Sequence, residues 1–204
     1  RTSVLAFDTS NSMAGAKFTQ AKAAALSYLD AVPDNIYVGM VTFDGSVDVA
    51  RQPTLNRDEM RATIRSLELA DSTSLNQGVM NAASLTGELG GRNVLVLSDG
   101  RDTTGTPLSD VLTTVKASGA KVDVVALQRS GTGLEALARI AKAGRGTVIQ
   151  TVDPATLTKT FQDEARNLTR QVLVTADVPA VGKPDGNVDV SIDAGAQSWT
   201  DTAY

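Results

Sequence analysis

The sequence predicts an α/β protein with a doubly wound, mostly parallel β-sheet, one antiparallel edge strand and a further β segment near its C-terminal end. Three observations lead to this prediction. Short β-branched runs alternate with longer stretches of helical periodicity, which is typical of a parallel sheet covered by helices. Residues 93–98 (NVLVLS) form an apolar run, as in a strand that is covered on both faces. Asp44-Gly45 separates two apolar runs and predicts a hairpin, which adds the antiparallel edge.

The strands of the sheet follow from these short apolar runs. They comprise residues 3–8, 37–43, 47–50, 93–98, 121–127 and 147–151. Because sheets of this kind bind ligands at the carboxyl ends of their parallel strands, the residues that follow each strand are the first candidates for a functional site.

Helices are predicted where apolar residues recur every three or four positions. They comprise residues 17–31, 57–67, 75–85, 106–117, 134–143 and 153–170. Thr106 is expected to cap one of these helices, with Pro107 at its first helical position, and Asp153-Pro154 to begin the last. Gly144 is expected to end the helix before it.

The pattern of the chain changes near residue 170. Residues 1–170 are expected to form the α/β domain. Residues 171–177 (QVLVTAD) and 187–193 (NVDVSID) instead alternate apolar and polar side chains, which is typical of antiparallel strands with one solvated face. Since two strands alone are marginally stable, we expect the tail 171–204 to be either the start of a truncated β-sandwich or a hairpin packed on the first domain. Trp199 is expected in the core of that tail.

The composition excludes several classes of function. The chain has 204 residues, of which 42% are hydrophobic and 21% charged, as in ordinary folded domains. It contains no His and no Cys, which excludes Ser-His-Asp triads, cysteine nucleophiles, disulfides and zinc sites built from those residues. A net charge of −4 argues against a nucleic-acid partner. No apolar run approaches the roughly 18 residues of a membrane span, so no direct membrane insertion is expected.

Side chains that carry oxygen gather near the ends of the predicted strands. They are Asp8, Ser10, Ser12, Thr73 and Asp99. Asp8 ends the strand 3–8, and Ser10 and Ser12 follow it. Asp99 follows the strand 93–98, and Thr73 precedes a predicted helix. Because these loops belong to one edge of a parallel sheet, they can converge. Carboxylates and hydroxyls are hard donors that suit Mg²⁺, Mn²⁺ or Ca²⁺. An ion held mainly by neutral hydroxyls would keep its attraction for one more anionic oxygen, such as an Asp or Glu of a partner protein.

In their order and their places at strand ends, these residues resemble the metal-ion-dependent adhesion site of von Willebrand factor type A (vWA) domains, a family that includes the integrin inserted domain. That motif is Asp-x-Ser-x-Ser after the first strand, then a distant Thr, then an Asp after the central strand. The resemblance covers roughly residues 2–170. The segments DTSNSMAGAKFTQAK and VLVLSDGRDT are similar to bacterial members, especially actinobacterial membrane-tethered ones.

This resemblance implies a Rossmann-like fold and a site for Mg²⁺, or for Mn²⁺ or Ca²⁺. It implies that Ser10, Ser12 and Thr73 bind the ion directly, and that Asp8 and Asp99 act mostly through water. The implied function is a non-enzymatic, adhesion-type module that captures an acidic residue of a partner protein. The implied location is extracytoplasmic, with a membrane tether outside the present chain, which begins on Arg1 and is expected to be a piece of a longer protein.

Two positions depart from the common motif. Asn11 stands where many relatives have Gly, and Asn tolerates left-handed backbone better than most residues. Asp71-Ser72 stands before Thr73 where relatives have Gly-Gly. An extra carboxylate near the ion is expected to raise its affinity for the protein and to lower its attraction for an external carboxylate, so Asp71 is a candidate modulator.

Two other functions remain open. The domain could be a scaffold of an envelope or secretion assembly in which a metal ion only stabilises the fold. A Mg²⁺-dependent phosphatase of the haloacid dehalogenase type also has an Asp after its first strand, but it would need a second acid where Ser10 stands.

Structural interpretations exist for the single motifs as well. Ser12 and Thr73 can cap helices, and Asp99-Gly100 can form a turn. Asp44 and Asp102 are interpreted as solvated loop charges.

Overall fold

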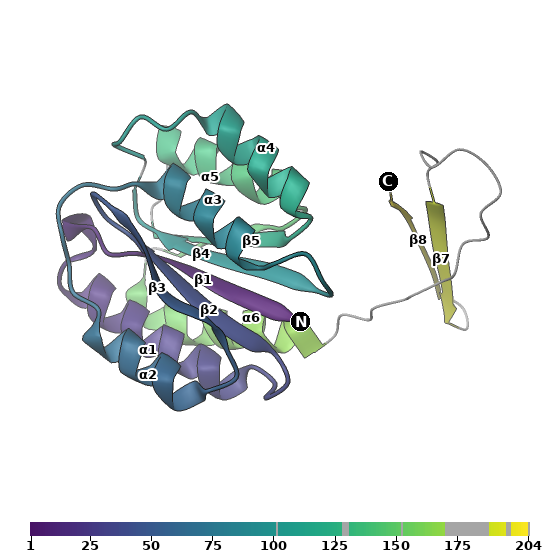
Figure 1. The fold of residues 1–204 in the computed structure, drawn as a ribbon, viewed down its shortest axis with the longest axis horizontal. Coiled ribbons are helices and arrows are strands. Elements are labelled where there is room, and N and C mark those ends of the chain that lie inside the picture. Colours follow the sequence, from purple (N-terminus) through teal and green to yellow (C-terminus); the bar gives the residue numbers. More distant parts are fainter. Residues whose placement is uncertain (101, 128–130, 152, 170–187, 195–196, 204) are drawn as a thin grey trace. The chain divides into compact units, whose positions relative to one another are not determined.

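The computed structural model describes residues 1–100, 102–127, 131–151, 153–169, 188–194 and 197–203 (Figure 1). The chain divides into two compact units, Arg1–Leu173 and Val174–Tyr204. The boundary predicted at residue 170 stays a prediction, to be tested by the cooperativity of unfolding of a chain that ends there.

The first unit is built on a six-stranded sheet with the order β3-β2-β1-β4-β5-β6. Its strands are β1 (Thr2–Asp8), β2 (Tyr37–Phe43), β3 (Val47–Thr54), β4 (Arg92–Ser98), β5 (Lys121–Ala126) and β6 (Val148–Gln150). All neighbours pair in parallel except β2 and β3, which are antiparallel. The predicted fold class, with its single antiparallel edge strand, is therefore confirmed.

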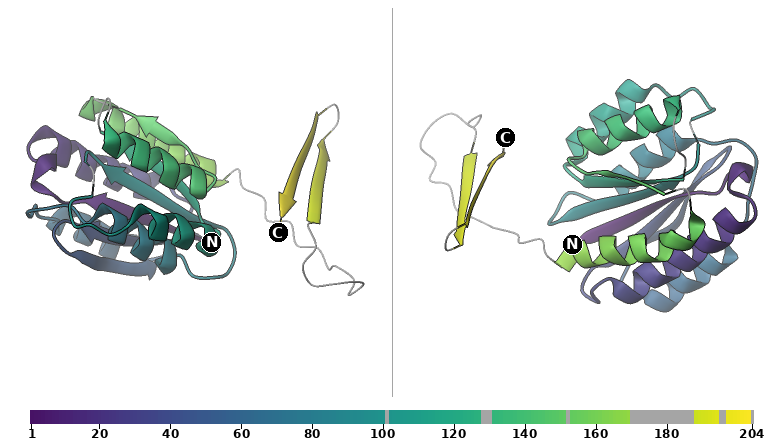
Figure 2. Two further views of the ribbon diagram at one scale, coloured as in Figure 1. Left: turned by 90° about the horizontal axis from the view of Figure 1, so that it is seen from above. Right: turned by 180° about the vertical axis from the view of Figure 1, so that it is seen from behind.

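Helices cover both faces of this sheet (Figures 1 and 2). The helices of one face are α1 (Ala16–Ala31), α2 (Arg57–Ser66) and α6 (Leu157–Thr169), and those of the other face are α3 (Leu75–Leu85), α4 (Leu108–Ser118) and α5 (Thr132–Ala143). Because side chains alternate along a strand, Leu5 and Phe7 of β1 join the core under the first set, whereas Val4 and Ala6 join the core under the second. This two-sided burial explains the continuous apolar runs of the central strands.

The strand order changes direction at β1. This strand pairs with β2 on one side and with β4 on the other, and both pairs are parallel. The chain therefore builds the sheet outward from β1 to β3, returns to the other side of β1 with β4, and continues to β6. The carboxyl ends of β1 and β4 flank this switch point, which is where open α/β sheets bind ligands. Asp8 ends β1, and Asp99 directly follows β4.

Some predicted boundaries are wrong. Strand β3 continues to Thr54, because it stays paired with β2 through two register irregularities. Helix α4 begins at Leu108 with Pro107 as its N-cap residue and no side-chain cap, so Thr106 does not cap it. Instead, the Thr106 carbonyl accepts a hydrogen bond from Asn76 at 2.6 Å. Residues 154–156 form a short 3₁₀ helix before α6.

The second unit contains a hairpin of β7 (Val188–Ala194) and β8 (Gln197–Ala203), which pairs Ile192 with Trp199. The predicted C-terminal β segment is thus present, and β7 overlaps the predicted strand 187–193 over residues 188–193. Strand β8 was not predicted, because its sequence shows little apolar alternation. The predicted strand 171–177 lies outside the described residues.

Candidate metal centre

Asp8 is a fully buried carboxylate at the end of the central strand β1. Its Oδ1 accepts hydrogen bonds from the backbone N–H of Ser10 at 2.9 Å and from the Ser10 hydroxyl at 2.5 Å. Its Oδ2 accepts one from the Ser98 hydroxyl at 2.6 Å. Burial raises the pKa of Asp8, and these donors oppose the rise. Among the described residues, no lysine or arginine forms an ion pair with Asp8.

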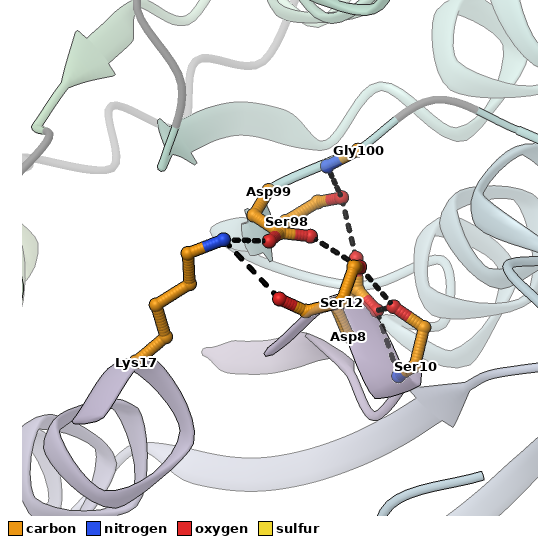
Figure 3. Close-up of polar contacts among 7 residues, drawn as sticks. All are labelled: Asp8, Ser10, Ser12, Lys17, Ser98, Asp99 and Gly100. Carbon is orange, nitrogen blue, oxygen red and sulfur yellow. Dashed lines mark hydrogen bonds and ion pairs between the residues drawn. The ribbon is translucent and has the colours of Figure 1, made fainter. Parts of the chain in front are cut away.

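Hydroxyl groups connect this carboxylate to Asp99 (Figure 3). The hydroxyl oxygens of Ser10 and Ser12 lie 2.8 Å apart, and the Ser12 hydroxyl donates to Oδ1 of Asp99 at 2.6 Å. We call these four residues, Asp8, Ser10, Ser12 and Asp99, the oxygen cluster. Ser12 lies in a 3₁₀ turn over Asn11–Met13, which follows Ser10 directly. The helix α1 begins later, with Gly15 as N-cap, so Ser12 does not cap it.

Thr73 is brought to the same edge by its backbone. Ala70 donates to the carbonyl of Thr9 at 2.9 Å and forms a parallel bridge with Ser10, which attaches the loop before α3 to the loop after β1. Thr73 is buried, and its backbone N–H donates to the Thr103 hydroxyl at 2.9 Å. Within the part of the chain that the structure describes, the Thr73 hydroxyl makes no hydrogen bond to the oxygen cluster.

Asp71 lies at the exposed rim of the site. Its Oδ1 accepts a hydrogen bond from the Asn11 amide at 2.5 Å, so the two departures from the common motif contact each other. Asn11 lies in the 3₁₀ turn and has no left-handed backbone. Ser72, which directly follows Asp71, has left-handed backbone with φ of 67°, a conformation that glycine adopts more readily.

Two aspartates that the sequence suggested to be solvated loop charges are instead structural acceptors. Asp44 accepts from the Thr9 hydroxyl at 3.0 Å, and Asp102 accepts from the backbone N–H of Asn76 at 3.0 Å. Asp102 therefore satisfies a free N–H at the start of α3, a task that Ser74, the N-cap residue, does not perform with its side chain.

Sequence reasoning also missed Lys17. Its ammonium donates to Oδ2 of Asp99 and to the backbone carbonyl of Ser12, the latter at 3.2 Å (Figure 3). The signal available in the sequence was a lysine soon after the Asp-x-Ser-x-Ser motif, at the beginning of a predicted helix. Ser98 was missed as well, although it directly precedes Asp99.

The donor set fits a hard divalent cation. The oxygen cluster offers carboxylate and hydroxyl oxygens, which suit Mg²⁺, Mn²⁺ and Ca²⁺. The Lys17 ammonium already binds two oxygens of these residues, which shows that they attract positive charge. Over the described ranges, no three side chains of His, Cys, Asp or Glu form a metal-binding group. A divalent ion would therefore depend on the hydroxyls.

Comparison with known proteins adds to this geometry. A family model described as the von Willebrand factor type A domain matches residues 4–164. The chain belongs to the vWA family. Among curated proteins, this vWA chain is 31% identical over 117 residues to the "UPF0353 protein" of the actinobacterium Nocardia farcinica, covering 50% of the chain and 35% of that protein. The match thus spans about a third of that relative's length.

Solved structures share the fold. A von Willebrand factor type A structure from Catenulispora acidiphila matches with a TM-score of 0.71 and 22% identity, covering 81% of this chain and 42% of that one. Proximal thread matrix protein 1 from the mussel byssus, described with a zinc-occupied metal-ion-dependent adhesion site, matches with a TM-score of 0.65 and 18% identity, covering 82% and 45%. At identities of 22% and 18%, these matches show a shared fold and do not by themselves show a shared function.

Proposed function

We propose that this vWA domain is a protein-binding module of the adhesion type that depends on a divalent metal ion. Asp8, Ser10, Ser12, Thr73 and Asp99 would hold Mg²⁺, or Mn²⁺ or Ca²⁺ in its place. The observation that carries the proposal is the oxygen cluster, in which hydroxyls join two carboxylates across the switch point of the sheet. The mussel relative supports it, because that protein is described with zinc in the corresponding motif.

Bound there, a divalent ion supplies a positive charge that attracts a carboxylate of a partner protein. The residues of the chain prepare the place for it. Ser98 and the backbone N–H of Ser10 hold the Asp8 carboxylate in one orientation. Thr9, which stands between Asp8 and Ser10 in the chain, is oriented by its hydrogen bond to the Asp44 carboxylate. The exposed position of Ser12 leaves the site open to a partner.

A structural metal in a scaffold is the second candidate. The burial of the Asp8 and Asp99 side chains favours it, since a cation bound beside buried carboxylates stabilises the folded state. Under that function a metal would raise stability, and it would bind no partner carboxylate.

We propose no catalytic role for this site. Ser10 stands where a phosphatase would need its general acid, and a hydroxyl is a poor proton donor at neutral pH. We also propose an extracytoplasmic location, in line with the description of the mussel protein as a thread matrix protein of the byssus. The proposal includes a membrane tether elsewhere in the full protein. None of the helices that the structure describes is long and apolar enough to cross a bilayer.

Calorimetry on metal-stripped protein tests the metal site. Mg²⁺, Mn²⁺ and Ca²⁺ are titrated into the parent chain and into Ser12→Ala and Asp99→Ala variants. We expect binding to the parent and a large loss in both variants. Ser46→Ala is the matched control, because its hydroxyl lies in the neighbouring loop and contacts Asp44 and Asp48. Equal binding by all four proteins would refute the site.

Short peptides test the capture of a carboxylate. A blocked tripeptide with a central Glu, and its Gln counterpart, are titrated by NMR at saturating metal and again with chelator. The proposed function requires binding of the Glu peptide in the presence of metal only. Metal binding without this preference would favour the scaffold function.

A further inference from the structure

The ammonium group of Lys17 lies beside the oxygen cluster and contacts Asp99 and the backbone carbonyl of Ser12 (Figure 3). It forms an ion pair with Oδ2 of Asp99, whose Oδ1 is held by Ser12. The Asp99 side chain is 3% exposed, whereas that of Lys17 is 38% exposed. A buried carboxylate at the proposed metal site is therefore neutralised by a cation that reaches it from the surface.

The position of Lys17 opposes a local rule of helix stability. It is the second residue of α1, which has no acidic residue in its first turn. Because the N-terminus of a helix carries partial positive charge, a lysine there is unfavourable. Gly15, with φ of 80°, sets the direction in which the chain enters α1. The bonds to Asp99 and to the Ser12 carbonyl offset this unfavourable position at the helix N-terminus. Residues that break a local rule of stability in this way are often functional.

A divalent ion and the ammonium would compete for the Asp99 carboxylate. The ammonium binds Asp99 and the backbone of Ser12, and both residues belong to the oxygen cluster. Like charges at contact distance in a partly buried site repel each other strongly. The flexible, partly exposed stem of Lys17 allows its ammonium to leave for water without any change in the backbone.

We propose that Lys17 is an internal cation that neutralises Asp99 in the metal-free domain and is displaced when a divalent ion binds. Metal uptake is then an exchange of one cation for another. The exchange keeps the metal-free domain folded with little unpaired buried charge, and it sets the metal affinity below the value that the oxygen ligands alone would give. This inference rests on the metal site of the proposed function.

The test is Lys17→Met in the full chain. By calorimetry with Mg²⁺, we expect roughly tenfold tighter binding than in the parent, since the ion no longer displaces a charge. By thermal unfolding with chelator, we expect a lower melting temperature, because Asp99 loses its partner. Saturating Mg²⁺ should then raise the melting temperature of the variant more than that of the parent.

Two controls separate this role from a general effect of charge. Lys22→Met removes the same charge from the same helix, but the Lys22 ammonium donates to the carbonyls of Arg65 and Leu67, so Mg²⁺ affinity should stay within about twofold of the parent. Lys17→Arg keeps the charge and should keep the parent affinity.

The outcomes distinguish this inference from the proposed function. Tighter Mg²⁺ binding by Lys17→Met alone supports the exchange. Equal or weaker binding by Lys17→Met, with the parent still binding, overturns the exchange and leaves the metal site standing. Absence of binding in both the parent and Lys17→Met overturns both proposals.

Discussion

Two buried aspartates of the sheet, Asp8 and Asp123, are satisfied in different ways. Asp123 of β5 forms an ion pair with Lys121 at 2.6 Å and accepts from the backbone N–H of Thr147 at 2.9 Å. Asp8 of β1 receives hydrogen bonds from two hydroxyls and one backbone N–H, and the described residues offer it no direct ion pair. A carboxylate that carries its own cation stabilises the fold, whereas one held by neutral donors still attracts positive charge.

Asp99 is intermediate between these two. It has a cation, Lys17, but that cation belongs to another element, α1, whereas Lys121 lies on the same strand as Asp123. The comparison therefore separates carboxylates with a structural role from those available for ligand binding.

The largest effect is expected for Asp8→Asn. The amide preserves the shape of the side chain but removes its charge, so Mg²⁺ affinity should fall at least about 100-fold, which corresponds to roughly 2.7 kcal/mol. Calorimetry gives the affinity, and the increase in melting temperature on addition of Mg²⁺ should disappear with it. Undiminished binding would exclude Asp8 from the metal site.

Asp123→Asn should affect stability instead. Loss of the charge leaves the Lys121 ammonium without its partner, and since that lysine is partly exposed we expect a loss of about 2 kcal/mol in the free energy of unfolding. Urea denaturation measures this value. Mg²⁺ affinity should be the same as in the parent, and a large change in it would show that the two aspartates are coupled.

The pH dependence of stability should distinguish Asp8 as well. Because burial raises its folded-state pKa above the unfolded value of 3.8, the folded state binds more protons between the two values. The stability of metal-free protein relative to the Asp8→Asn variant should therefore fall as pH rises from the unfolded pKa through the folded one. Urea denaturation of both proteins with chelator, at a series of pH values from about 4 to 8, measures this difference. A difference that rises with pH would contradict the raised pKa.

Ser72→Gly should raise stability slightly. Left-handed backbone costs a residue with a Cβ roughly 1–2 kcal/mol, and the greater freedom of glycine in the unfolded chain offsets about 0.5–1 kcal/mol of this gain. Arg145→Gly is the matched control, since Arg145 has φ of 54° in the turn between α5 and β6. Both variants should gain about 0.5–1 kcal/mol in urea denaturation. If Arg145→Gly gains stability and Ser72→Gly does not, the Ser72 side chain itself stabilises the loop.

The smallest effect is expected for Asp71→Gly. Because Asp71 is exposed and contacts Asn11 at the rim, screening limits its influence on an ion in the site. Mg²⁺ should bind about twofold to threefold more weakly, which corresponds to well under 1 kcal/mol, and a Glu peptide should bind more tightly at saturating metal. If neither affinity changes, Asp71 has no role as a modulator.

The sequence alone determined the architecture and most of the candidate ligands. Two patterns identified the strands. Apolar residues alternate with polar ones where one face of a strand is buried, and they are continuous where both faces are buried. Asp8, Ser10, Ser12 and Asp99 could be selected because each stands at or directly beyond the carboxyl end of a strand. These are local properties of the chain, so they could be predicted even though the predicted boundaries of β3 and α4 were wrong.

Only the tertiary structure decided which partners these side chains have. Lys17 and Asp99 are 82 positions apart, and Asp8 and Ser98 are 90 apart. Asp102 completes the start of α3 from a different loop, and β8 is a strand because β7 pairs with it. Such contacts depend on the order of the strands and on the direction in which each loop leaves the sheet. A side chain's neighbours across the fold therefore cannot be read from its own segment, because packing brings them together from distant parts of the chain.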